Sequence, residues 1–183
     1  LDWGKATRSD QLFSGDQVRT GEKALAILKF MDNSIVRVRE HSELTINRDL
    51  ESGKVMKNID LNNGGFGFSF KKQKDEQFRL TSPTSVASIR GTKGTFSRGN
   101  QEDTLVITEG LVNFRNTVSN KDVDVGAGSI GFSNQDGTIT SRLATQKELD
   151  EANNTAGGGS SNELRLELRD PKGNKKELKL RYR

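Results

Sequence analysis

Apolar and polar residues alternate in short runs along the first 140 residues of the chain. Between residues 24 and 30 the more apolar face recurs at every second position, which is the period of a β-strand. Residues 36–39 alternate in the same way, with valine on one face and arginine on the other. A two-residue loop at Asp32-Asn33 would join the two runs as a hairpin, because Asn tolerates the positive φ that such a loop demands.

Further runs of this kind follow at short spacing, without helical segments between them. Their apolar positions are Leu44 and Ile46, Phe66, Phe68 and Phe70, Phe78 and Leu80, Val86 and Ile89, Leu105 and Ile107, Val112 and Phe114, Val123 and Val125, and Ile130 and Phe132. This succession predicts an all-β protein of many short strands, arranged as a β-solenoid, a roll or a sandwich. Gly67 and Ser69 leave one face of their strand nearly bare, which suits close contact with another backbone.

One short helix is expected after the strands. Thr145 and Glu148 fit a capping box, with Thr145 as the N-cap, and the helix should end near Asn153. Residues 155–162 then have the Gly/Ser-rich composition of a flexible linker.

The chain closes with a predicted β-hairpin around a turn at residues 170–173. Its two apolar rows are Leu164, Leu166 and Leu168, and Leu178, Leu180 and Tyr182. Because an isolated hairpin is marginal in water, these rows should cover the main domain, a second chain or a neighbouring domain. The predicted organisation is therefore a β domain over 1–142, a helix over 143–154, a linker over 155–162 and a hairpin over 163–183.

Composition narrows the classes of protein that fit. Only 31% of the 183 residues are hydrophobic and 30% are charged, which suits sheets, where alternate residues alone need to be apolar. The net charge of +4 is spread among interleaved acids and bases, which indicates a solvated surface, with an anionic polymer as the alternative partner. Long Lys/Arg runs are absent, so we expect no nucleic-acid partner. No stretch has the length of a transmembrane helix.

The sequence offers little for catalysis or metal binding. There is no cysteine, which excludes thiolate zinc sites. The single histidine, His41, is expected in a surface turn; it has no second histidine or cysteine to anchor a transition metal with it, and no sequence pattern marks a Ser-His-Asp set around it. Asp122 and Asp124 share one strand face, whereas calcium needs six or more oxygens. We therefore expect no enzyme activity, no metal and no cofactor.

Four blocks of the sequence, in order, resemble the FecR domain family. Residues 12–21 follow the pattern L-x-x-G-D-x-V-x-T-G, and residues 78–92 resemble the stretch x-x-T-P-x-x-V-A-x-V-R-G-T. Residues 106–112 and 125–128 resemble the V-x-E-G-x-V and V-x-A-G blocks. The departures from the family pattern are Asn33 in place of Gly, Ser82 in place of Thr and Ser129 in place of Gln.

The resemblance implies a β-solenoid or roll outside the cytoplasm. Some FecR domains form the periplasmic part of regulators that relay transporter occupancy to a sigma factor, and others are free-standing exported modules. We expect a periplasmic or otherwise exported docking module that binds an envelope protein or a cell-wall or outer-membrane polymer. Self-association through the hairpin is a further option. The alternative is the sensor part of a transmembrane anti-sigma regulator.

The candidate binding residues are Arg90, Gly91, Thr92 and Glu109. Arg90 could hold a carboxylate or phosphate, whereas the structural interpretation pairs it with an acid such as Glu109. The resemblance also implies a second chemistry, because some FecR-type regulators cleave themselves at a Gly-Thr bond. Thr92 would then attack the Gly91 carbonyl.

Overall fold

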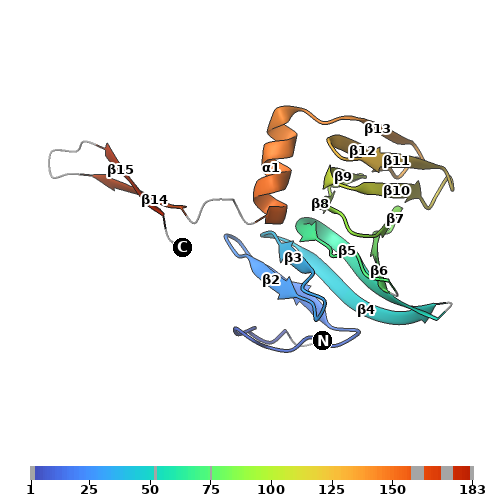
Figure 1. Cartoon of the computed structure of the whole chain (residues 1–183), viewed down its shortest axis with the longest axis horizontal. Helices are drawn as coiled ribbons and strands as arrows, with labels where there is room; N and C mark the ends of the chain where they lie inside the picture. Colours follow the sequence, from blue (N-terminus) through green and yellow to red (C-terminus); the bar gives the residue numbers. More distant parts are fainter. Residues whose placement is uncertain (1–2, 52, 75, 158–162, 170–174, 182–183) are drawn as a thin grey trace.

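The computed structural model describes residues 3–51, 53–74, 76–157, 163–169 and 175–181, with side chains through residue 157. Thirteen strands form the main body (Figure 1). They are β1 (Gln17–Arg19), β2 (Ala26–Lys29), β3 (Ile35–Val38), β4 (Glu43–Glu51), β5 (Lys54–Ser69), β6 (Glu76–Thr81), β7 (Ser85–Ile89), β8 (Lys93–Arg98), β9 (Glu102–Glu109), β10 (Leu111–Asn116), β11 (Asp122–Gly126), β12 (Ser129–Asn134) and β13 (Ile139–Leu143).

The long strand β5 serves two sheets. Its first part pairs with β4 and β6 in sheet A, which continues through β7 and β10 to β11. Its second part, from Gly64, pairs with β3 and β8 in sheet B, which continues through β9 and β12 to β13. Gly64 has a φ of +81°, and the Ser42 hydroxyl both accepts from the Gly65 amide and donates to its carbonyl. Glycine is therefore required where the strand changes sheets.

The sheets enclose one phenylalanine-rich core. Phe66, Phe68, Phe96 and Phe114 are fully buried, and ring contacts link them. Their partners in the core include Val36, Leu44, Ile59, Leu61, Leu80, Leu105 and Ile107. Nine strands follow one path from β11 to β13, and those two end strands lie near each other, so the path nearly closes on itself. The mostly β class with one short helix is confirmed.

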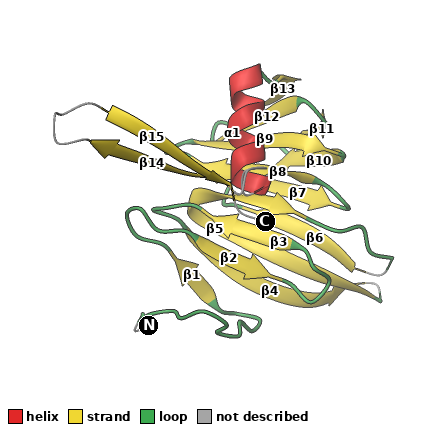
Figure 2. Ribbon diagram, turned by 60° about the vertical axis from the view of Figure 1, so that its left-hand side comes forward, coloured by secondary structure: helices red, strands yellow, loops and turns green. Residues whose placement is uncertain are grey.

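Helix α1 (Gln146–Gly157) lies against sheet B, over β5, β8 and β9 (Figure 2). Val106, Ile130 and Ala152 form its buried contact. The bare face of β5 lies close to another backbone, as expected, because a Cβ on Gly67 would lie 2.5 Å from the Thr155 carbonyl carbon in α1. The helix runs past the predicted end at Asn153, because Arg37 Nη1 donates to the Ala156 carbonyl at 2.5 Å.

The loop between β2 and β3 differs from the prediction by one residue. The Phe30 amide donates to Ser34, so three residues, Met31 to Asn33, form the loop instead of two. Asn33 does adopt positive φ, at 64°. The extra residue lets the Asp32 carboxylate accept from the Ser34 amide at 2.9 Å.

The C-terminal strands β14 (Glu163–Arg169) and β15 (Lys175–Arg181) form a separate antiparallel pair. The register sets Leu164 opposite Leu180 and Leu166 opposite Leu178, so these positions share a face. Tyr182 and the predicted turn lie outside the described residues. No helix in the described part of the chain is long and apolar enough to cross a membrane.

Candidate functional site

The predicted residues Arg90, Gly91 and Thr92 form the turn between β7 and β8. Gly91 has a φ of +66°, and the Phe70 amide donates to the Thr92 carbonyl at 3.0 Å. The turn between β9 and β10 packs on this one, since a Cβ on Gly110 would lie 3.2 Å from the Gly91 carbonyl oxygen. The structure thus packs the two turns that carry the candidate residues against each other.

Two lysines join Arg90 there. A Cβ on Gly91 would lie 2.8 Å from the Cβ of Lys72, and the Lys71 amide donates to Ser34 Oγ at 2.9 Å. The side chains of Lys71, Lys72 and Arg90 are all exposed. We call these three residues the basic turn cluster.

The acid that was expected to pair with Arg90 has another neighbour. The Glu109 carboxylate lies 3.7 Å from Lys93 Nζ, and no ion pair among the described residues includes Arg90. Glu109 is 72% exposed, so its pair with Lys93 contributes little to stability. Within the part of the chain that the structure describes, the exposed guanidinium of Arg90 thus has no acid partner.

A nearly buried lysine supports the loops behind this cluster. Lys57 Nζ lies 2.9 Å from Asp32 and 2.5 Å from Glu76, above the ring of Phe78. Burial works to raise the pKa of Asp32, but hydrogen bonds from Lys57 and the Ser34 amide, with the lysine charge, hold that pKa below its ordinary value. The ion pairs thus fix the β2–β3 loop and the start of β6.

Comparison with known proteins agrees with the sequence blocks and the fold. The FecR protein family matches residues 16–113, which is more than half of the chain. The chain belongs to the FecR family.

Two crystal structures of a candidate anti-sigma factor from Parabacteroides distasonis ATCC 8503 share the fold of this FecR chain. They have TM-scores of 0.61 and 0.62 at 9% sequence identity. The match covers 74% of this chain, but only 62% and 63% of the length of the two matched chains. No curated protein matches the chain.

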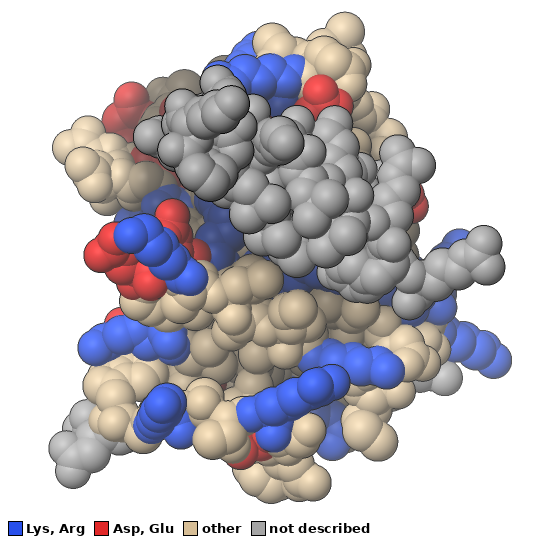
Figure 3. All heavy atoms as spheres, turned by 90° about the vertical axis from the view of Figure 1, so that its left-hand side faces the viewer, with Lys and Arg blue, Asp and Glu red and all other residues tan. Residues whose placement is uncertain are grey.

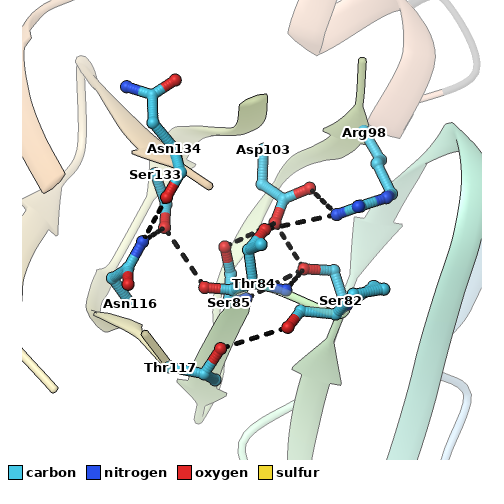
Figure 4. A network of polar contacts seen from close by, with 10 residues as sticks. Ser82, Thr84, Ser85, Arg98, Asp103, Asn116, Thr117, Ser133 and Asn134 are labelled. Carbon is cyan, nitrogen blue, oxygen red and sulfur yellow. Dashed lines mark hydrogen bonds and ion pairs between the residues drawn. The ribbon is translucent and has the colours of Figure 1, made fainter. Parts of the chain in front are cut away.

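The FecR block at residues 82–85 builds a polar network inside the protein (Figure 4). The hydroxyls of Ser82, Thr84 and Ser85 all donate to one oxygen of Asp103, the last two at 2.5 and 2.6 Å. Arg98 donates to the other oxygen at 2.8 Å, and Asp103 is fully buried. The network joins the β6–β7 corner of sheet A to the β8–β9 hairpin of sheet B.

The sequence prediction missed this pair of charged residues. Arg98 and Asp103 flank the turn between β8 and β9 and face each other in the register. Opposite charges on either side of a hairpin turn were the available signal. The three hydroxyls come from a distant block, and nothing in the sequence places them next to Asp103.

Within the described residues, the hydroxyl of Thr92 is hydrogen-bonded to a backbone carbonyl and not to a base. It lies 3.5 Å from the Arg90 carbonyl oxygen, and no hydrogen bond among the described residues joins it to a carboxylate, an imidazole or an amine. Thr92 is also buried, at 2% exposure. These contacts support a structural role for Thr92 in the turn.

Two grooves in the described surface lie elsewhere. One groove of about 480 Å³ is lined by residues that include Arg39, Gly65 and Ser97. A second groove of the same volume is lined by residues that include Gln17 and Pro83. Neither includes the basic turn cluster, whose three side chains are exposed on loops. This arrangement suits contact with a large partner better than enclosure of a small ligand.

Proposed function

We propose that this FecR domain is a non-enzymatic docking module of the bacterial envelope that binds an anionic envelope protein or polymer through the basic turn cluster. The observation that carries the proposal is Arg90, which is exposed, lies beside Lys72 and makes no ion pair among the described residues. An arginine fork binds carboxylate and phosphate groups in two-point geometry. Lys57 fixes the β2–β3 loop and the start of β6, and Ser34 of that loop in turn accepts from the Lys71 amide.

The test is capture from envelope extract with three forms of the whole chain as bait. The wild type should retain a partner that the Lys72→Glu/Arg90→Glu variant loses. A Lys23→Glu/Lys147→Glu variant is the matched control, because each of these lysine side chains is 86% exposed and lies outside the cluster. Equal capture by all three baits would contradict the proposal.

The location of this docking module is proposed as periplasmic or otherwise exported, on the basis of the family. A second function, the sensor part of an anti-sigma regulator, is favoured by the shared fold with the Parabacteroides protein. The identity of the captured partner separates the two. An outer-membrane transporter would support the sensor, whereas a wall or outer-membrane polymer would support the free-standing module.

The leucine rows of the hairpin, with Tyr182, stay a predicted interface. A bait that ends at residue 161 tests whether an external partner needs them. Loss of capture with this bait, while the control variant still binds, would assign docking to the hairpin instead of the turns.

A further inference from the structure

Strand β2 leaves one edge of sheet B open. It pairs with β3 on one side, and no backbone hydrogen bond among the described residues reaches its other side. Natural proteins protect such edges with charges, bulges or a covering segment, because an open edge accepts a further strand. Here Leu25 and Ile27 are 62% and 60% exposed at the edge. Some segment should cover it.

The two faces of β2 define the strand that would fit beside it. On the core side, Ala26 and Leu28 are only partly buried against the core, so an added strand should place apolar residues there. On the outer side, β2 and β3 carry no acid; the residues in these alternating positions are Leu25, Ile27, Lys29, Ile35, Arg37 and Arg39. Lys and Arg also predominate over Asp and Glu on the face drawn in Figure 3. Acids are therefore favoured on the outer side of the added strand.

Strand β14 of the same chain has the apolar row that the core side of this edge requires. Leucine occupies every second position from Leu164 to Leu168, and the opposite face alternates two acids with two bases: Glu163, Arg165, Glu167 and Arg169. The register with β15 puts the leucine positions of both strands on one face. A two-stranded sheet is marginally stable by itself, so that face needs a partner.

The hairpin can reach the edge. The end of α1 is held above Gly67, and Gly67, Arg37 and Ile27 follow one another across β5, β3 and β2. A strand beyond β2 would lie three strand spacings from β5, about 14 Å. Residues 158–162 can span about 17 Å when extended. So short a tether holds the hairpin at an effective concentration of roughly millimolar, which favours its own chain over a second copy.

We propose that β14 pairs with the open edge of β2 in the same chain and extends sheet B, with the leucine positions toward the core. The hairpin then acts as a built-in edge cover that blocks sheet-to-sheet association. This proposal does not involve the basic turn cluster, so it can fail while the docking function stands.

Cross-linking tests the pairing, because the chain has no cysteine of its own. The test variant is Ile27→Cys/Arg165→Cys, treated with a short bifunctional thiol reagent. The control is Leu111→Cys/Arg165→Cys, since Leu111 is 61% exposed on β10 and so matches Ile27. We expect an intramolecular product at least tenfold more abundant in the test variant and independent of protein concentration. Equal yields would overturn the proposal, and so would a mainly dimeric product, which would show the hairpin of a second copy at the edge.

Hydrogen exchange gives a second readout that needs no substitution. Removal of residues 158–183 should speed exchange of the β2 amides at least tenfold and leave β12, inside sheet B, unchanged. Unchanged exchange in β2 would contradict the proposed pairing.

Discussion

At the residue scale, Asp103 is a fully buried carboxylate with four side-chain partners. Its carboxylate satisfies three hydroxyls and the Arg98 guanidinium in a site without exposure. A buried charge of this kind is tolerated only while its partners remain. Internal hydrogen bonds therefore account for Ser82, Thr84 and Ser85 within the block at residues 78–92.

The substitution Asp103→Ala should lower the free energy of unfolding by about 3–5 kcal/mol, because it leaves Arg98 and the hydroxyls unpaired. Urea unfolding measures the change. The control is Asp122→Ala, an exposed carboxylate bound to Asn113, which should cost less than about 0.5 kcal/mol. Similar losses in both variants would contradict the role given to the network.

At the scale of elements, α1 shows what sequence can and cannot predict. The capping box was predicted, and the Thr145 amide does donate to Glu148 at 2.7 Å. Glu148 also pairs with Arg142, a contact from the preceding strand that no local pattern indicates. The end of the helix was predicted too early, since its last turn depends on Arg37, more than 100 residues away in sequence.

The contact beneath the helix gives a prediction for Gly67→Ala. The new Cβ would meet the Thr155 and Ala156 backbone, so α1 must shift, at a cost of about 1–3 kcal/mol. Hydrogen exchange in residues 150–157 should accelerate. Gly21→Ala is the matched control, because nothing lies within 4 Å of a Cβ there and its φ is not positive. If the two variants behave alike, close contact with α1 is not the reason for a glycine at position 67.

The N-terminus of α1 gives a pH prediction. Hydrogen bonds from Arg142 and from the Thr145 amide lower the pKa of Glu148 from 4.5 to about 2. A lowered pKa in the folded state stabilises the cap fully above pH 4.5, and this contribution is lost as pH falls toward 2. Titration of the Thr145 amide by NMR should report a midpoint near 2. Arg142→Ala should move the midpoint upward, and a midpoint near 4.5 in the wild type would contradict the cap.

At the scale of the whole molecule, the strands were predictable and their arrangement was not. Alternation located most strands, and Phe66 and Phe68 of β5 were recognised as one face together with Phe70, which follows the strand directly. The bend of β5 at Gly64, and the parallel pairing of Val55 with Glu76, depend on contacts between distant segments. Period-two patterns carry no information about which strand lies next to which.

The Thr92 hydroxyl, whose described hydrogen bond goes to the Arg90 carbonyl and not to a base, gives a prediction for the intact chain. Purified protein kept at neutral pH should keep a single mass of 20.2 kDa. Two fragments that divide between Gly91 and Thr92 would show self-cleavage and would favour the regulator. Thr92→Ala should abolish such fragments if they form.

The central claim is that the basic turn cluster docks this domain to an anionic envelope partner. The most direct measurement is elution of the whole chain from immobilised envelope components along a salt gradient, because charge contacts weaken as salt rises. The wild type and the Lys23→Glu/Lys147→Glu control should elute together, at a higher salt concentration than Lys72→Glu/Arg90→Glu. Coincident elution of all three proteins would contradict the claim.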